Sequence, residues 1–363
     1  MILAWASVAC GQDVVVDGRF EQLPAGDGYV ISDAEVTPDS GAVRLDEFVQ
    51  AEPCEACGPA ACGPACGRRC PKWTVQVDAL MLWQGAIPSR PLYRDTATQA
   101  PVIDADDLQT SVTIDPRYAI LYHVDECRAF EVNYFNLSGF EGERLAPVTN
   151  GAYEMSELAG LNYEGLDGVG AASAAAIKSL EFNLRRRGWG EIQWLTGFRW
   201  VEWNQRLFVA DVFDQGAGFD TFDVSTVNNL YGWQWGGDLM LWNRGDRLRV
   251  NGVVKGGVYY NHQAAQRTVF ETNRPDESNE TLGDGEDTVA FVGETGVMAS
   301  YSLTNWLAVR VGYTFFWLAG VATPADQLAA SRTNVQVPAP EAKVSPYGSV
   351  FLQGVQTGVE ARW

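Results

Sequence analysis

The chain has 363 residues, of which 12% are aromatic, and a formal net charge of −20. Such a negative charge repels nucleic acid phosphates, which argues against nucleic acid as a partner. No stretch offers the roughly 20 unbroken apolar residues that a spanning helix needs. The best stretch, residues 311–325, is interrupted by two glycines and a proline. A helical membrane protein is therefore excluded, whereas a β-barrel, whose strands alternate in polarity, is not.

The first segment, residues 1–11 (MILAWASVACG), is apolar and ends in small residues, as an export signal does. It is short and lacks a positive start, so we interpret it as an export signal that is clipped. A weaker alternative is a lipoprotein processing site at Cys10. Residues 12–71 are acidic at first and then rich in Cys, Gly and Pro. Their lack of periodicity predicts a flexible, disordered periplasmic segment.

Five cysteines lie within seventeen residues of that segment: Cys54, Cys57, Cys62, Cys66 and Cys70. Outside the cytoplasm disulfides are the favoured fate of such thiols. Five cysteines cannot all pair among themselves, so an intermolecular disulfide is one interpretation. An inert linker is the second. A zinc knuckle is the third, and it is disfavoured by irregular spacing and by the lack of a nearby histidine.

From residue 73 onward apolar and polar side chains alternate, which is typical of β-strands with one apolar face. The pattern predicts strands over 73–83, 117–124, 130–134, 180–184, 192–212, a sixth that begins after 214–218 and ends at 242, and then 248–260, 289–303, 307–317 and 351–363. The apolar faces are free of charge across their centres. In the last strand the apolar row is Val355, Thr357, Val359, Ala361 and Trp363. Outer-membrane barrels end in this way, and we predict that barrel-assembly machinery reads this row.

Connections between these strands alternate in length. Short turns are predicted at 125–127, 186–190, 243–247 and 303–305. Long loops include 139–176, with an Ala-rich helical turn at its end, and the acidic stretch 264–286. A soluble sandwich has no reason to sort loops by length, whereas outer-membrane barrels have short periplasmic turns and long external loops. Residues 72–363 are therefore predicted to form one all-β, antiparallel, transmembrane up-and-down β-barrel.

We expect about ten strands, with twelve as the alternative, in contact with lipid of a bacterial outer membrane and with both termini periplasmic. The polar faces place a charge network in the lumen, formed by Asp78, Glu131, Glu181, Arg185, Glu191, Arg199, Asp238, Arg249, Lys255, Glu294, Arg310, Glu360 and Arg362. The signs nearly balance, and buried charges must be paired or solvated. Because eight strands close on a packed interior and sixteen leave a channel, ten strands predict a narrow, largely occluded bore.

Catalytic and metal sites are not predicted. The only histidines, His123 and His262, sit at predicted strand ends and are interpreted as rim residues. The acidic run 276–287 resembles no EF-hand loop, so a solvated loop is favoured over a Ca²⁺ site. No nucleophile elbow, phosphate loop or zinc-protease motif occurs in the sequence. We therefore expect no cofactor and no enzymatic activity, with a barrel hydrolase as a remote alternative.

Four segments carry a resemblance to a known family: 187–200 (RGWGEIQWLTGFRW), 226–237 (TVNNLYGWQWGG), 290–304 (AFVGETGVMASYSLT) and 309–321 (VRVGYTFFWLAGV). With the terminal strand, they resemble the putative beta-barrel porin-7 family of planctomycete bacteria over roughly residues 73–363. The resemblance implies an outer-membrane barrel and assigns no functional residues. The leading functional hypothesis is a narrow porin-like channel for ions or small solutes. The alternative is a structural or adhesive envelope protein, in which a closed barrel anchors a cysteine-rich cross-linking arm.

Overall fold

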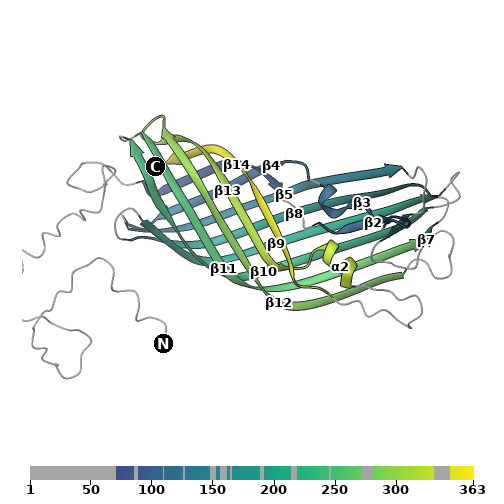
Figure 1. Cartoon of the computed structure of the whole chain (residues 1–363). Coiled ribbons are helices and arrows are strands. Elements are labelled where there is room, and N and C mark those ends of the chain that lie inside the picture. The colour runs from purple at the N-terminus through teal and green to yellow at the C-terminus, as the bar shows by residue number, and fades with distance from the viewer. Residues whose placement is uncertain are drawn as a thin grey trace, which may run out of the picture.

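The structure is a computed structural model, and ten of its strands form one closed antiparallel barrel (Figure 1). It describes residues 71–85, 89–108, 110–125, 127–147, 153–155, 162–163, 166–188, 192–213, 219–244, 247–271, 280–330 and 344–363. The barrel strands are β1 (Trp73–Gln84), β4 (Thr113–His123), β5 (Arg128–Pro147), β8 (Leu166–Arg187), β9 (Ile192–Phe213), β10 (Phe219–Arg244), β11 (Leu248–Glu271), β12 (Glu280–Ser302), β13 (Leu307–Val321) and β14 (Gly348–Arg362). The predicted strand count and up-and-down topology are confirmed.

The barrel closes where the first strand pairs with the last. β1 lies between β14 and β4, with Thr74 opposite Arg362 on one side and opposite Leu121 on the other. Every other barrel strand pairs with its two neighbours in the barrel. Over the length that all ten strands share, closure removes the free sheet edge and satisfies the backbone groups internally, as a hydrocarbon environment requires.

At the level of Glu181 and Lys255, apolar side chains face outward and charged side chains face inward. Phe182 is 50% exposed and Val254 is 62% exposed, whereas their neighbours Glu181 and Lys255 are 0% and 4% exposed. A water-soluble protein has the opposite arrangement, because exposed apolar surface in water is unfavourable. Each strand therefore places a row of apolar side chains on the outside, where they contact hydrocarbon.

The strands are unequal in length. β1 and β4 have 12 and 11 residues, whereas β8 has 22 and β10 has 26. A spanning strand needs about 9–11 residues. About half of each long strand therefore stands outside the membrane, and Figure 1 shows β5 and β8 to β12 running on beyond the other barrel strands.

We call the parts of β5 and β8 to β12 that extend beyond the membrane the extramembrane wall. Two of the predicted loops lie in it and were wrong. Much of 139–176 and 264–286 is strand, because β5 continues to Pro147 and β11 continues to Glu271. The Ala-rich piece near 171–176 lies in β8 and is not a helical turn. There Ala171 pairs with Arg144 of β5 on one side and Val209 of β9 on the other. Pairing on both sides overrides the weak strand propensity of alanine.

A small cap lies against the inner side of this wall. The strands β2 (Pro91–Asp95), β3 (Pro101–Asp104), β6 (Tyr153–Met155) and β7 (Asn162–Tyr163) form a second sheet. The 3₁₀ helix η2 (Ala105–Asp107) and the helix α2 (Pro324–Ala330) complete it. Its apolar cluster consists of Leu92, Tyr93, Ile103, Ala105, Leu108, Val169, Ala171, Leu207, Val209, Phe222 and Val224. Because six of these residues belong to β8, β9 and β10, the cap and the wall share one core.

The chain leaves β13 by turning into the barrel. Gly320 has a φ of +80°, a conformation that disfavours other residues. Beyond it, the side chain of Asn228 in β10 donates to the carbonyl of Ala322 at 2.9 Å and accepts from its N–H at 2.7 Å. Asn261 of β11 donates to the carbonyl of Gly320 at 3.0 Å. These bonds replace a sheet ladder and hold the start of the cap over the lumen.

Among the residues that the structure describes, no helix is both long enough and apolar enough to span a membrane.

Candidate functional site: the barrel lumen

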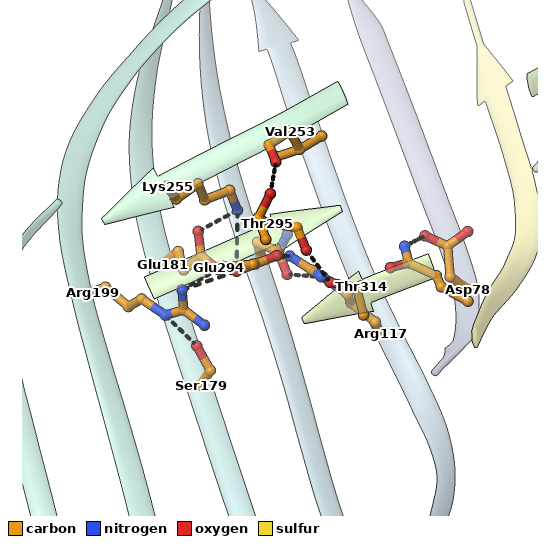
Figure 2. Close-up of polar contacts among 12 residues, drawn as sticks. Asp78, Arg117, Ser179, Glu181, Arg199, Val253, Lys255, Glu294, Thr295 and Thr314 are labelled. Carbon is orange, nitrogen blue, oxygen red and sulfur yellow. Dashed lines mark hydrogen bonds and ion pairs between the residues drawn. The ribbon is translucent and has the colours of Figure 1, made fainter. Parts of the chain in front are cut away.

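The centre of the lumen is a cluster of buried ion pairs (Figure 2). Glu294 of β12 accepts from Arg117 of β4 at 2.8 Å and from Arg199 of β9 at 2.9 Å. Glu181 of β8 accepts from Lys255 of β11 at 2.9 Å. In the barrel β4 and β12 are separated by β1, β14 and β13, so the Arg117–Glu294 bond crosses the lumen.

Two further groups extend this cluster. Arg185 bonds Glu131 at 2.5 Å and also binds Asp238, which ties β5, β8 and β10 together. Asp78 of β1 accepts from Gln356 of β14 at 2.6 Å and lies 3.4 Å from a guanidinium nitrogen of Arg310. Nearer the short turns, Glu360 accepts from Gln76 at 2.8 Å and contacts Arg362, while Arg249 lies 3.8 Å away.

We call the following ten residues the charge network: Asp78, Glu131, Glu181, Asp238, Glu294, Arg117, Arg185, Arg199, Lys255 and Arg310. Carboxylates and cations are equal in number, so the network is neutral as a whole. Removing water from charges is costly unless each charge meets an opposite one, and here each does. A cavity of about 70 Å³ lies among Asp78, Arg117, Glu131 and Lys255, with room for a few water molecules.

The sequence prediction omitted one central member of the network. Arg117 is 6% exposed and bonds Glu294, whereas the sequence pattern predicts it only as the start of a strand. Strand alternation identifies it, because Tyr118 next to it faces outward. The amides of Asn183 and Gln234, which donate to Glu181, were omitted as well. Glu191 and the five cysteines of residues 54–70 lie outside the described residues.

Above the charge network the lumen is filled by apolar side chains. This apolar layer consists of Leu80, Leu82, Phe135, Leu137, Phe140, Ala175, Ile177, Val201, Trp203, Leu230, Tyr259, Ala290, Val292, Phe316, Leu318, Val321, Val350 and Leu352. Every barrel strand except β4 contributes to it. None of these side chains is more than 7% exposed. The layer therefore closes the lumen by packing.

The order of the layers can be followed along one strand. On β9 the inward residues are Arg199 in the charge network, Trp203 in the apolar layer and Val209 in the cap cluster. The first two layers touch through aromatic rings. The guanidinium of Arg117 lies 5.6 Å from the ring centre of Phe135, and that of Arg199 lies 5.7 Å from Phe316. These cation–π contacts add to the ion pairs.

The two histidines are placed differently. His123 ends β4 near the short turns, where its Nε2 lies 2.9 Å from the hydroxyl of Thr74. His262 lies within β11 and not at its end, which corrects the sequence interpretation. Its Nδ1 is 2.7 Å from an Asp287 carboxylate oxygen, and both side chains are more than half exposed.

The C-terminal row lies where the sequence placed it. Val355 sits between Met81 of β1 and Tyr313 of β13, and Val359 sits between Val77 and Val309. Trp363 ends the row and is 62% exposed.

A closed antiparallel barrel with a greasy outer face and a charged interior defines an outer-membrane β-barrel protein. The model of the family described as Putative beta barrel porin-7 (BBP7) matches residues 147–363. The chain belongs to that family.

Among solved structures, the chain is similar to the outer membrane protease OmpT from Escherichia coli, with 9% identity over 80% of this chain and 96% of that chain, at a TM-score of 0.46. It is similar to the translocator domain of autotransporter NalP from Neisseria meningitidis, with 9% identity over 80% and 88% of the two chains, at 0.35. The toluene transporter TodX from Pseudomonas putida has 8% identity over 80% and 88%, at 0.32. No curated protein matches the chain.

Proposed function

We propose that the protein is a narrow porin-like channel of the outer membrane that is closed at rest. Ions and small solutes pass only when the apolar layer opens. The observation that carries the proposal is the arrangement of two sections in series along β8 and β9. The charge network surrounds a small polar cavity, and the buried side chains of the apolar layer pack above it. Hydrophobic constrictions of this kind gate channels by excluding water.

The charges give the proposed channel weak selectivity. The charge network is neutral, so the lumen favours neither anions nor cations. The cap and the wall carry exposed carboxylates, among them Asp106, Asp107, Glu141 and Glu143. These attract cations toward the entrance and set a mild cation preference, which is reduced by salt.

We place both termini in the periplasm. The N–H of Lys72 donates to the carbonyl of Trp363 at 2.7 Å, so both ends of the described barrel lie at the end that carries the short turns. In outer-membrane barrels the short turns are periplasmic. The wall and the cap then face the exterior. Recognition of the C-terminal row by barrel-assembly machinery stays a prediction.

Conductance in planar lipid bilayers tests the channel. The wild-type protein is expected to give rare, small current steps. Substitution of both Phe135 and Phe316 by Ala removes the rings that meet across the lumen, and it is expected to increase the frequency and size of the steps. The matched control is Phe130→Ala, which removes a ring from the outer face. Silence of the wild type and of the double variant, with both proteins folded, would contradict the channel.

The second candidate is an envelope anchor with a permanently closed barrel. It is favoured by the shared core of cap and wall, because a well-packed external domain suits presentation at the surface. In this candidate the five cysteines of residues 54–70 cross-link the protein within the envelope. Higher-mass bands on non-reducing gels that disappear on reduction, together with silent bilayers, would support it.

A further inference from the structure

Charged side chains divide between the two ends of the barrel. At the end with the short turns, Lys72, Arg128, Arg244 and Arg247 are exposed and Arg186 is half-buried; we call these five residues the basic belt. The described carboxylates at this end are Asp125, which binds Arg128, and Glu360, which is buried. The opposite end carries the exposed carboxylates of the wall and the cap. Among the described residues of a chain with a net charge of −20, this end is thus the basic one.

The belt lies on the outer face, where the apolar band ends. Arg186 of β8 stands directly between Arg128 of β5 and Trp194 of β9 in the sheet register. Trp194 is 57% exposed, and exposed indoles mark the boundary between hydrocarbon and headgroups. Arg244 follows the exposed Trp242 on the same face of β10. The arginines therefore lie at headgroup depth.

The pairing of β5 with β8 places two positive charges directly opposite each other. Arg128 and Arg186 are directly paired residues on neighbouring strands, an arrangement that is unfavourable unless an anion lies nearby. Asp125 binds Arg128 at 2.6 Å, and the two side chains are 40% and 58% exposed. Across the described ranges no side chain binds the guanidinium of Arg186 or Arg244. An anion from outside the chain would supply the counter-charge that the described residues do not give these two groups.

The belt covers only part of the circumference. It runs from Lys72 before β1, past β5 and β8, to Arg247 before β11, whereas the turn between β12 and β13 carries no charged residue. Lipid surrounds the barrel on every side, so a uniform attraction would need basic residues all round it. The belt instead forms an arc. The arc therefore marks the part of the barrel with the greatest attraction for anionic headgroups.

We propose that the basic belt binds the phosphate groups of anionic phospholipid in the leaflet at the turn end. Guanidinium groups suit this ligand, because their planar N–H groups match two phosphate oxygens at once. Phosphatidylglycerol is the probe that we choose. The inference is independent of whether the lumen conducts.

Native mass spectrometry of the full chain in detergent tests the proposal, by titration with phosphatidylglycerol or phosphatidylcholine. The wild type is expected to bind phosphatidylglycerol more tightly. Arg186→Gln is expected to weaken that binding about fivefold, the contribution of one cation at an anionic surface. Arg186→Lys keeps the charge and should retain most of the binding. Arg206→Gln is the matched control, because Arg206 is exposed in the extramembrane part of β9.

Folding of each variant is verified by the anomalous gel migration of unheated barrels. Equal affinity of the wild type for the two lipids would overturn the proposal. So would unchanged phosphatidylglycerol binding in the Arg186→Gln/Arg244→Gln double variant. Displacement of phosphatidylglycerol by inorganic phosphate alone would show a site for free anions in place of a lipid surface.

Discussion

The rings of Phe135 and Phe316 meet inside the barrel with their centres 5.5 Å apart. Their strands, β5 and β13, are separated by β4, β1 and β14 on the shorter way round. The contact therefore spans the lumen. This contact lets the apolar layer pack across the lumen, between the cap and the charge network.

Truncation of this ring pair should destabilise the barrel. Phe135→Ala and Phe316→Ala each remove a fully buried ring, and we expect a loss of about 3–5 kcal/mol in the free energy of unfolding. The double variant should lose about 0.5–1.5 kcal/mol less than the sum, because the rings contact each other. Urea unfolding in detergent measures all three values. Strict additivity would argue that the rings do not touch.

Neutralisation of Glu294 should be costly. Glu294→Gln keeps the shape of the side chain but leaves Arg117 and Arg199 without their main partner. We expect a loss of about 3–5 kcal/mol, as for other broken buried pairs. The control is Glu202→Gln, because its partner Lys178 is 37% exposed and such pairs contribute about 1 kcal/mol or less. Similar unfolding free energies for the two variants would refute this difference.

Loss of the Asn228 side chain should release the chain after β13. Asn228→Ala removes both bonds to Ala322 and leaves buried backbone groups unpaired, at a cost of about 1–3 kcal/mol. Hydrogen exchange at the amide of Ala322 should become faster. Asn204→Ala serves as the control, since the one described partner of the Asn204 side chain is the side chain of Glu202. An unchanged exchange rate at Ala322 would mean that other contacts hold this segment.

The seam between β1 and β14 should not tolerate a side chain at Gly354. A Cβ atom built there would lie 1.9 Å from the carbonyl oxygen of Met81. Gly354→Val is therefore expected to prevent closure, and the folded fraction on an unheated gel should fall sharply. Gly283→Val should fold normally, because the nearest atom to its Cβ is 3.9 Å away.

Acid should remove the contribution of Asp125. Hydrogen bonds from Arg128 lower the pKa of this carboxyl below its ordinary value. A lowered folded-state pKa stabilises the protein above the unfolded-state pKa of about 3.9, and the benefit is lost as the pH falls below it. Because both side chains are exposed, the effect is at most about 0.5 kcal/mol. Asp125→Asn should therefore be slightly less stable than the wild type at neutral pH and equal to it in acid.

Local periodicity predicted the membrane part of the fold. Alternation assigned an inward or outward face to residues such as Glu181 and Phe182, and the four short turns followed from loop length. Periodicity did not predict the wall. In the upper parts of β8 and β11 small and polar residues occupy both faces, because neither face contacts hydrocarbon there. In these parts the outward row of apolar side chains ends, although the backbone hydrogen bonds between the strands continue.

The cross-lumen contacts were beyond sequence reasoning. Alternation shows that Lys255 and Glu181 both face inward, but it does not show that strands three places apart bring them within 2.9 Å. That distance depends on strand tilt and on the register at every ladder between them. The cap depends on still longer-range packing, since Tyr93 contacts Asp211.

The extramembrane wall also affects whether two copies of the protein can pair through their sheet edges. Residues 280–290 of β12 pair with β11 on one side, and no described strand lies on the other. An edge without a described partner strand can pair with the edge of another copy. Asp284, Glu286 and Asp287 are exposed along it, and charged side chains on an edge disfavour such pairing.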